Sequence, residues 1–60
     1  MINLNAQEYA QYLFNQGFSA ITNGQEVVNR CKRYNRSYEY ILEVLNELEE
    51  LEYLTEQGGK

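Results

Sequence analysis

The chain has 60 residues, a length that allows one domain with one small core. Its formal net charge at pH 7 is −4. The acidic excess argues against indiscriminate binding to nucleic acid or to an anionic membrane, which needs clustered Lys and Arg. With no His, no Asp and a single Cys, the chain has no ligand set for a metal and no acid–base pair. We therefore expect no enzyme activity, no cofactor and no small-molecule substrate. No apolar run reaches membrane-spanning length, so we expect a cytoplasmic protein.

The first predicted helix has a well-specified start. Asn5 is a good N-cap, and Glu8 is placed to return its hydrogen bond in a capping box. Gly17 followed by Phe18 is typical of a left-handed C-cap whose apolar residue folds back on the last turn. These signals predict a helix from about Ala6 to Gln16.

The second predicted helix is short and has two candidate starts. Thr22 with Gln25, or Asn23 with Glu26, fits a capping pair. Its buried positions follow helical spacing: Val27, Val28 and Cys31. We expect the helix to end near Arg33. Cys31 lies between apolar positions and is predicted to be a small core residue.

A break in the chain is predicted at Tyr34–Arg36, because Asn35 tolerates turn geometry. Ser37 is a strong N-cap for a third helix that begins at Tyr38. Four of the five cationic residues lie within seven positions around this break. They form what we call the basic patch: Arg30, Lys32, Arg33 and Arg36. Seven of the nine Glu residues follow it, between Glu39 and Glu56, so the chain is bipolar along its sequence.

The third predicted helix is long and acidic. Its apolar positions repeat at helical spacing: Ile41, Val44, Leu45, Leu48 and Leu51. At about 100° per residue Glu52 falls on this apolar stripe, while Tyr53 and Leu54 fall away from it. Two continuations are open after Leu51. Either the helix ends and 53–55 runs extended, or it continues in a coiled-coil register with Ile41, Val44, Leu48 and Leu51 at the a and d positions.

Together these elements predict an all-α, three-helix domain over residues 1–57 and a mobile tail at 58–60. From Ile21 to Leu54 the order of features resembles the winged-helix and helix-turn-helix family of transcriptional regulators. The resemblance rests on Thr22-Asn23-Gly24-Gln25-Glu26-Val27-Val28 and on Leu45-Asn46-Glu47-Leu48-Glu49-Glu50-Leu51-Glu52-Tyr53-Leu54. Glu52 stands where the family has Gly, and no wing is expected.

The resemblance implies a small DNA-binding regulator, homodimeric and of a kind common in phages and mobile elements. The start of the third helix would then enter the major groove of double-stranded DNA. Arg36 and Asn35 would read bases, and Arg30, Lys32 and Arg33 would contact phosphate. The implied DNA-binding residues are Arg30, Lys32, Arg33, Asn35, Arg36, Ser37 and Tyr38, with Glu39 beside them.

Two further interpretations follow from the residues themselves. The first is an acidic module that binds and inhibits or tethers a protein partner through the Glu-rich third helix, with Tyr residues as anchors. The second is a helical assembly unit held through the apolar stripe from Ile41 to Leu51. For protein binding the expected interface residues are Tyr40, Val44, Leu48, Leu51 and Tyr53. Net acidity favours a protein target, and the basic patch favours DNA.

Overall fold

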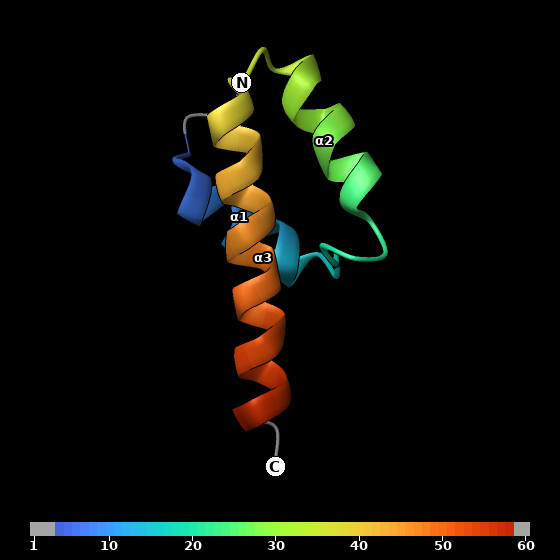
Figure 1. Ribbon diagram of the computed structural model, residues 1–60, viewed down its shortest axis with the longest axis vertical. Helices are drawn as coiled ribbons and strands as arrows, with labels where there is room; N and C mark the ends of the chain where they lie inside the picture. Colours follow the sequence, from blue (N-terminus) through green and yellow to red (C-terminus); the bar gives the residue numbers. More distant parts are fainter. Residues whose placement is uncertain (1–3, 59–60) are drawn as a thin grey trace.

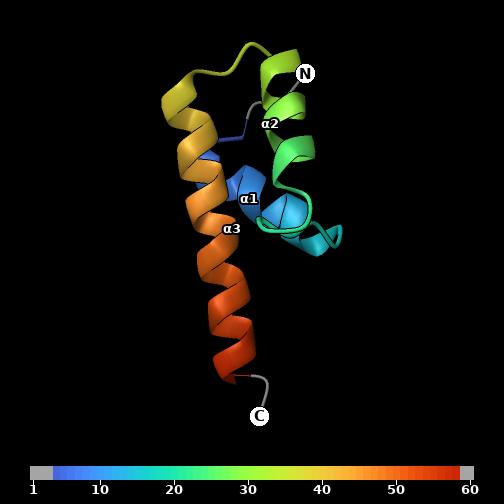
Figure 2. The same cartoon turned by 45° about the vertical axis from the view of Figure 1, so that its right-hand side comes forward.

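The computed structural model describes residues 4–58, and the side chains of residues 4–55. Its three helices are α1 (Ala6–Asn15), α2 (Gly24–Arg33) and α3 (Tyr38–Gly58), so the predicted all-α three-helix domain is confirmed. The molecule is elongated, with principal extents of 38 × 20 × 19 Å. In both ribbon views α1 crosses α3 near its middle, and α2 runs beside the first half of α3 (Figures 1 and 2). The second half of α3 extends beyond the other two helices.

The start of α1 is built as predicted. The Glu8 backbone N–H donates to the Asn5 Oδ1 at 2.8 Å, and the Asn5 N–H donates to the Glu8 Oε1 at 3.0 Å, which completes the capping box. At the other end Gly17 has a φ of 94°, the left-handed conformation expected there. The Phe18 N–H donates to the Leu13 carbonyl at 3.0 Å, and the Phe18 ring packs against the core. This bond directs the chain back toward α2.

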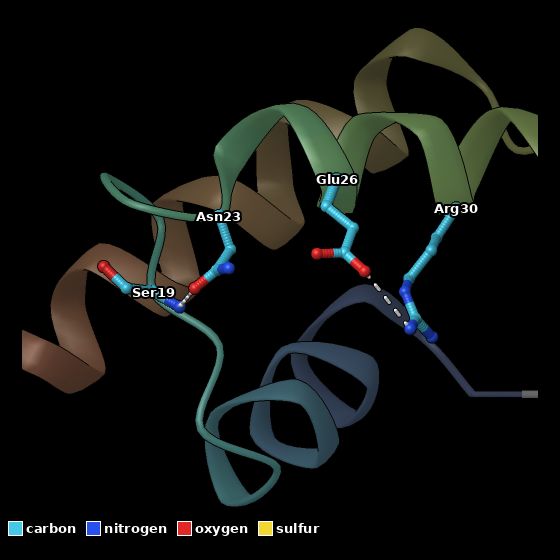
Figure 3. Close-up of polar contacts among 4 residues, drawn as sticks. All are labelled: Ser19, Asn23, Glu26 and Arg30. Carbon is cyan, nitrogen blue, oxygen red and sulfur yellow. Dashed lines mark hydrogen bonds and ion pairs between the residues drawn. The ribbon is translucent and has the colours of Figure 1, made fainter.

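Neither predicted capping pair forms at the start of α2. Asn23 is the N-cap residue, but its side chain makes no capping hydrogen bond. Its Oδ1 instead accepts the backbone N–H of Ser19 at 3.0 Å, so the amide closes the loop that precedes the helix (Figure 3). Glu26, the partner expected for Asn23, instead pairs with Arg30 at 3.5 Å. The prediction was wrong because a short polar side chain at this position has a competing partner in the loop.

The break between α2 and α3 forms as predicted. Asn35 is the one non-glycine residue with a positive φ, 59°, among those described. The Arg36 N–H donates back to the Cys31 carbonyl at 3.0 Å, which turns the chain sharply after α2. Ser37 then caps α3, because its Oγ accepts the Tyr40 N–H at 3.1 Å. The last turn of α2 and the turn that follows it carry the basic patch, and they lie at the same end of the molecule as the start of α3 (Figure 1).

All three helices contribute to the core. Its buried members among the described residues are Ala6, Tyr9, Ala10, Leu13, Val27, Cys31, Ile41, Val44 and Leu48. Cys31 is fully buried, which confirms its predicted role. Three predicted core positions, Val28, Leu45 and Leu51, are half-buried, and the first two pack against this cluster. The contacts between α1 and α3 are much more extensive than those between α2 and α3.

Of the two continuations open after Leu51, the extended one is wrong, because α3 runs on as a helix to Gly58. The coiled-coil register of the other continuation stays a prediction. Glu52 faces the rest of the molecule, as its position on the apolar stripe predicted. Its carboxylate accepts the Ala20 backbone N–H at 2.6 Å and the Ser19 hydroxyl at 3.3 Å. A charged residue is accommodated at this position because the loop after α1 presents two donors to it. The predicted mobile tail, 58–60, lies outside the described residues apart from Gly58, the last residue of α3.

Candidate interaction surfaces

The basic patch is only partly available to a ligand. The Arg30 guanidinium lies 4.9 Å from the centre of the Phe18 ring and also pairs with Glu26 (Figure 3). The Arg36 guanidinium lies 4.8 Å from the centre of the Tyr40 ring and is half-buried. These contacts hold both groups against the protein's own aromatic rings. Lys32 and Arg33 are exposed, so the outward part of the basic patch is these two side chains.

The other residues implied in DNA binding lie at the turn and at the start of α3. Asn35, Ser37 and Tyr38 are exposed there, next to the last turn of α2. The Ser37 oxygen is occupied as the helix cap. Glu39 is exposed in the first turn of α3. The structure thus gathers the seven implied residues at one end of the molecule, and it places a carboxylate among them.

The five predicted protein-interface residues do not share one surface. Val44 and Leu48 are fully buried in the core of the single chain, so this prediction needs correction. Tyr40 is half-buried, and its hydroxyl donates to the Leu4 carbonyl at 2.9 Å. Leu51 is half-buried, and only Tyr53 is exposed. An apolar stripe indicates burial but does not say whether the covering surface belongs to the same chain, and here α1 and α2 supply it.

A different surface of α3 is exposed from Tyr38 to Tyr53. We call it the outer face, and it consists of Tyr38, Leu42, Asn46, Glu49, Glu50 and Tyr53. At about 100° per residue these positions form one continuous stripe, turned away from the buried positions of the helix. All six are exposed, and the large apolar ones are 74% (Tyr38), 43% (Leu42) and 60% (Tyr53) accessible. Asn46, Glu49, Glu50 and Tyr53 line a shallow hollow in this face.

The outer face combines aromatic and aliphatic groups with carboxylates. Exposed Tyr and Leu side chains on a helix provide area for binding a protein, and the carboxylates beside them favour a cationic partner. Sequence reasoning identified Tyr38 and Tyr53 separately but missed the stripe. A signal was present, since Tyr38, Leu42, Asn46, Glu49 and Tyr53 follow spacings of four, four, three and four residues. It was obscured by the stronger apolar pattern on the buried side.

The reactive side chains of the interior are held in their neutral forms. Burial raises the pKa of the Cys31 thiol, and the nearby Arg36 only partly opposes this effect. Burial likewise raises the pKa of the Tyr40 hydroxyl, and the positive charge of Arg36 again opposes this effect only partly. A buried thiol with a raised pKa is a poor nucleophile. Over residues 4–58, no three His, Cys, Asp or Glu side chains are grouped so that they could hold a metal ion.

No described helix is both long enough and apolar enough to cross a lipid bilayer. In comparisons with known proteins, no family model, no curated protein and no solved structure matches the chain.

Proposed function

We propose that this protein is a small helical module that binds another protein through the outer face of α3. The observation that carries the proposal is the exposure of Tyr38, Leu42 and Tyr53 on one stripe of a helix whose other side is fixed in the core. A chain this small has few apolar groups to spare for its surface, since its own core is small. Placing three large ones on the same helical stripe is costly for solubility unless a partner covers them.

The charge of the stripe indicates the chemistry of the partner. Glu49 and Glu50 flank Tyr53, and α3 carries no Lys or Arg within its bounds. Cationic groups on a partner would lie over the Tyr53 ring and against these carboxylates, both of which attract positive charge. We therefore propose a protein with a basic surface as the target. The binding would weaken as the salt concentration rises, because the carboxylates are at the surface.

The test is a capture experiment with matched surface variants. Immobilised wild-type protein, Leu42→Glu, Tyr53→Glu and Ile21→Glu are each exposed to nuclease-treated lysate of the source cells. Ile21 is the control because it is 81% exposed and lies outside α3. We expect a protein that the wild type and Ile21→Glu retain and that Leu42→Glu and Tyr53→Glu lose. Equal capture by all four proteins, or no capture by any of them, would contradict the proposal.

Specific DNA binding remains a second candidate, and one observation favours it. Lys32 and Arg33 are exposed beside the turn that leads into α3, where the helix-turn-helix resemblance places phosphate contacts. Against it stands the carboxylate of Glu39 at the same end of the molecule, in the first turn of α3. This candidate would be supported if the wild type binds a mixed-sequence DNA duplex at low salt and the double variant with Lys32→Ala and Arg33→Ala does not. No binding by the wild type under those conditions would exclude it.

We further propose a cytoplasmic location. The Cys31 thiol is free and fully buried, as is usual for a protein that folds in a reducing compartment. Fractionation of the source cells tests this proposal.

A further inference from the structure

The hollow in the outer face of α3 has the arrangement of a receptor for one side chain. It is lined by Asn46, Glu49, Glu50 and Tyr53. These residues follow one another at positions i, i+3, i+4 and i+7, the set of four that accepts one side chain of a neighbouring helix in coiled coils. Asn46 and Tyr53 are about 10 Å apart along the helix axis, and the two Glu residues lie on either side of the line that joins them. The hollow can therefore hold one side chain of a partner.

The polar groups of this hollow are not used by the described part of the chain. Three other acidic side chains have partners there: Glu8 caps α1, Glu26 forms an ion pair, and Glu52 binds the loop after α1. The four side chains of the hollow make no ion pair, no hydrogen bond and no ring contact with another described residue. Two carboxylates, an amide and an aromatic ring are therefore open together to a cation from another molecule.

An arginine side chain matches these groups better than a lysine side chain does. Its guanidinium is flat, so it can stack on the Tyr53 ring while its N–H groups donate in their own plane to Glu49 and Glu50. The Asn46 carbonyl oxygen can accept a further N–H. The lysine ammonium is a compact charge without a flat face, so it cannot combine ring stacking with paired hydrogen bonds. The chain itself contains this kind of contact, because two of its guanidinium groups lie 4.9 and 4.8 Å from the centres of aromatic rings.

We infer that this hollow receives one arginine side chain of the partner protein, which fixes the position of the partner on the outer face of α3. The inference rests on the proposed function, because it names the group by which the partner binds that face. The apolar part of the face, Tyr38 and Leu42, is centred about 14 Å from the hollow, toward the start of the helix. The partner therefore presents an arginine and an apolar group about 14 Å apart. The arginine supplies specificity, and the apolar group supplies buried area.

Two synthetic peptides of equal charge test the choice of arginine. Fluorescently labelled octa-arginine and octa-lysine are titrated with the wild type at low salt, and fluorescence anisotropy gives the two dissociation constants. We expect octa-arginine to bind roughly fivefold more tightly, because only its side chains can stack on the ring of Tyr53 and pair with the carboxylates together. Tyr53→Leu should make the two affinities nearly equal, since it removes the ring and keeps an apolar side chain. Equal affinities of the wild type, or a preference that Tyr53→Leu retains, overturn the inference.

Two double variants with the same change in net charge test the location. Glu49→Gln with Glu50→Gln neutralises the hollow, whereas Glu39→Gln with Glu43→Gln neutralises two exposed carboxylates in the first half of α3. We expect the first pair to weaken octa-arginine binding roughly fivefold and the second pair to weaken it much less. All four positions are exposed, so circular dichroism of both variants should match that of the wild type. Equal weakening by the two pairs would mean that the peptide responds to net charge alone, and would overturn the inference.

These results separate the inference from the proposed function. If the wild type does not prefer octa-arginine but still captures a protein that Leu42→Glu loses, the proposed function stands and the arginine anchor is wrong. If the hollow selects arginine and no protein is captured from the lysate, the arginine site stands and the proposed function fails.

Discussion

The carboxylate of Glu52 accepts the backbone N–H of Ala20 at 2.6 Å, across 32 residues of sequence. The same carboxylate accepts the Ser19 hydroxyl at 3.3 Å. Glu52 thereby ties the second half of α3 to the loop between α1 and α2. This contact fixes the direction in which α3 leaves the three-helix body, and with it the direction in which the outer face points.

Replacing Glu52 by Gln should lower the free energy of unfolding by about 1 kcal/mol, because hydrogen bonds to a charged acceptor are the stronger ones. Urea denaturation followed by circular dichroism measures this change. Glu50→Gln is the matched control, since Glu50 is exposed on the same helix and should change the stability very little. Equal effects of the two substitutions would show that the contact with the loop contributes nothing.

Gly17→Ala should destabilise the fold by about 1 kcal/mol, because the left-handed conformation at this position is unfavourable for a residue with a Cβ atom. The φ of Gly17 is 94°, and an added Cβ would meet no atom within 4 Å, so the cost is that of the backbone alone. Gly24→Ala is the control. Its Cβ also meets nothing, and it lies in the first turn of α2. Thermal unfolding should show a lower midpoint for Gly17→Ala and an equal or higher one for Gly24→Ala.

Alkaline pH should destabilise the protein. Burial raises the pKa values of Cys31, Tyr9 and Tyr40 in the folded state, so the fold favours their neutral forms. The unfolded chain releases these protons at lower pH than the folded chain. The free energy of unfolding should therefore be level near neutral pH and fall as the pH rises past about 8.5 for the thiol and about 10 for the phenols.

Urea denaturation at about pH 7, 9 and 10.5 measures this fall. Tyr40→Phe is the informative variant. It loses the hydrogen bond from the Tyr40 hydroxyl to the Leu4 carbonyl and should be less stable at neutral pH by about 1 kcal/mol. As the pH rises past about 10, the free energy of unfolding of this variant should fall less than that of the wild type. A stability that rises with pH in this range would contradict the assignment of these groups to the interior.

Local signals predicted the helix boundaries well. The Asn5 and Glu8 capping box, the left-handed Gly17 and the Ser37 cap each involve residues within four positions of one another, so the sequence contains the complete interaction. The start of α2 shows the limit of this reasoning. The Asn23 side chain had candidate partners on both sides of it in the sequence, and in the structure it accepts the Ser19 N–H and makes no capping bond.

Contacts between distant segments could not be predicted in this way. The partners of Glu52 lie in a loop more than thirty residues earlier. Periodicity placed Glu52 on the buried side of α3, but nothing in the sequence identified the donors that would satisfy its charge. The same limit explains why Val44 and Leu48 were assigned to an interface. An amphipathic pattern indicates that one side is covered and cannot tell an intramolecular cover from an intermolecular one.

Photo-cross-linking in living cells tests most directly whether the outer face of α3 is a binding surface. A photoreactive phenylalanine analogue is placed at position 42 in one variant and at position 21 in the other, both exposed in the single chain. We expect a species heavier than one chain after illumination of the position-42 variant and none from the position-21 variant. Cross-linking from position 21 alone, or from neither position, would show that the outer face is not a binding surface.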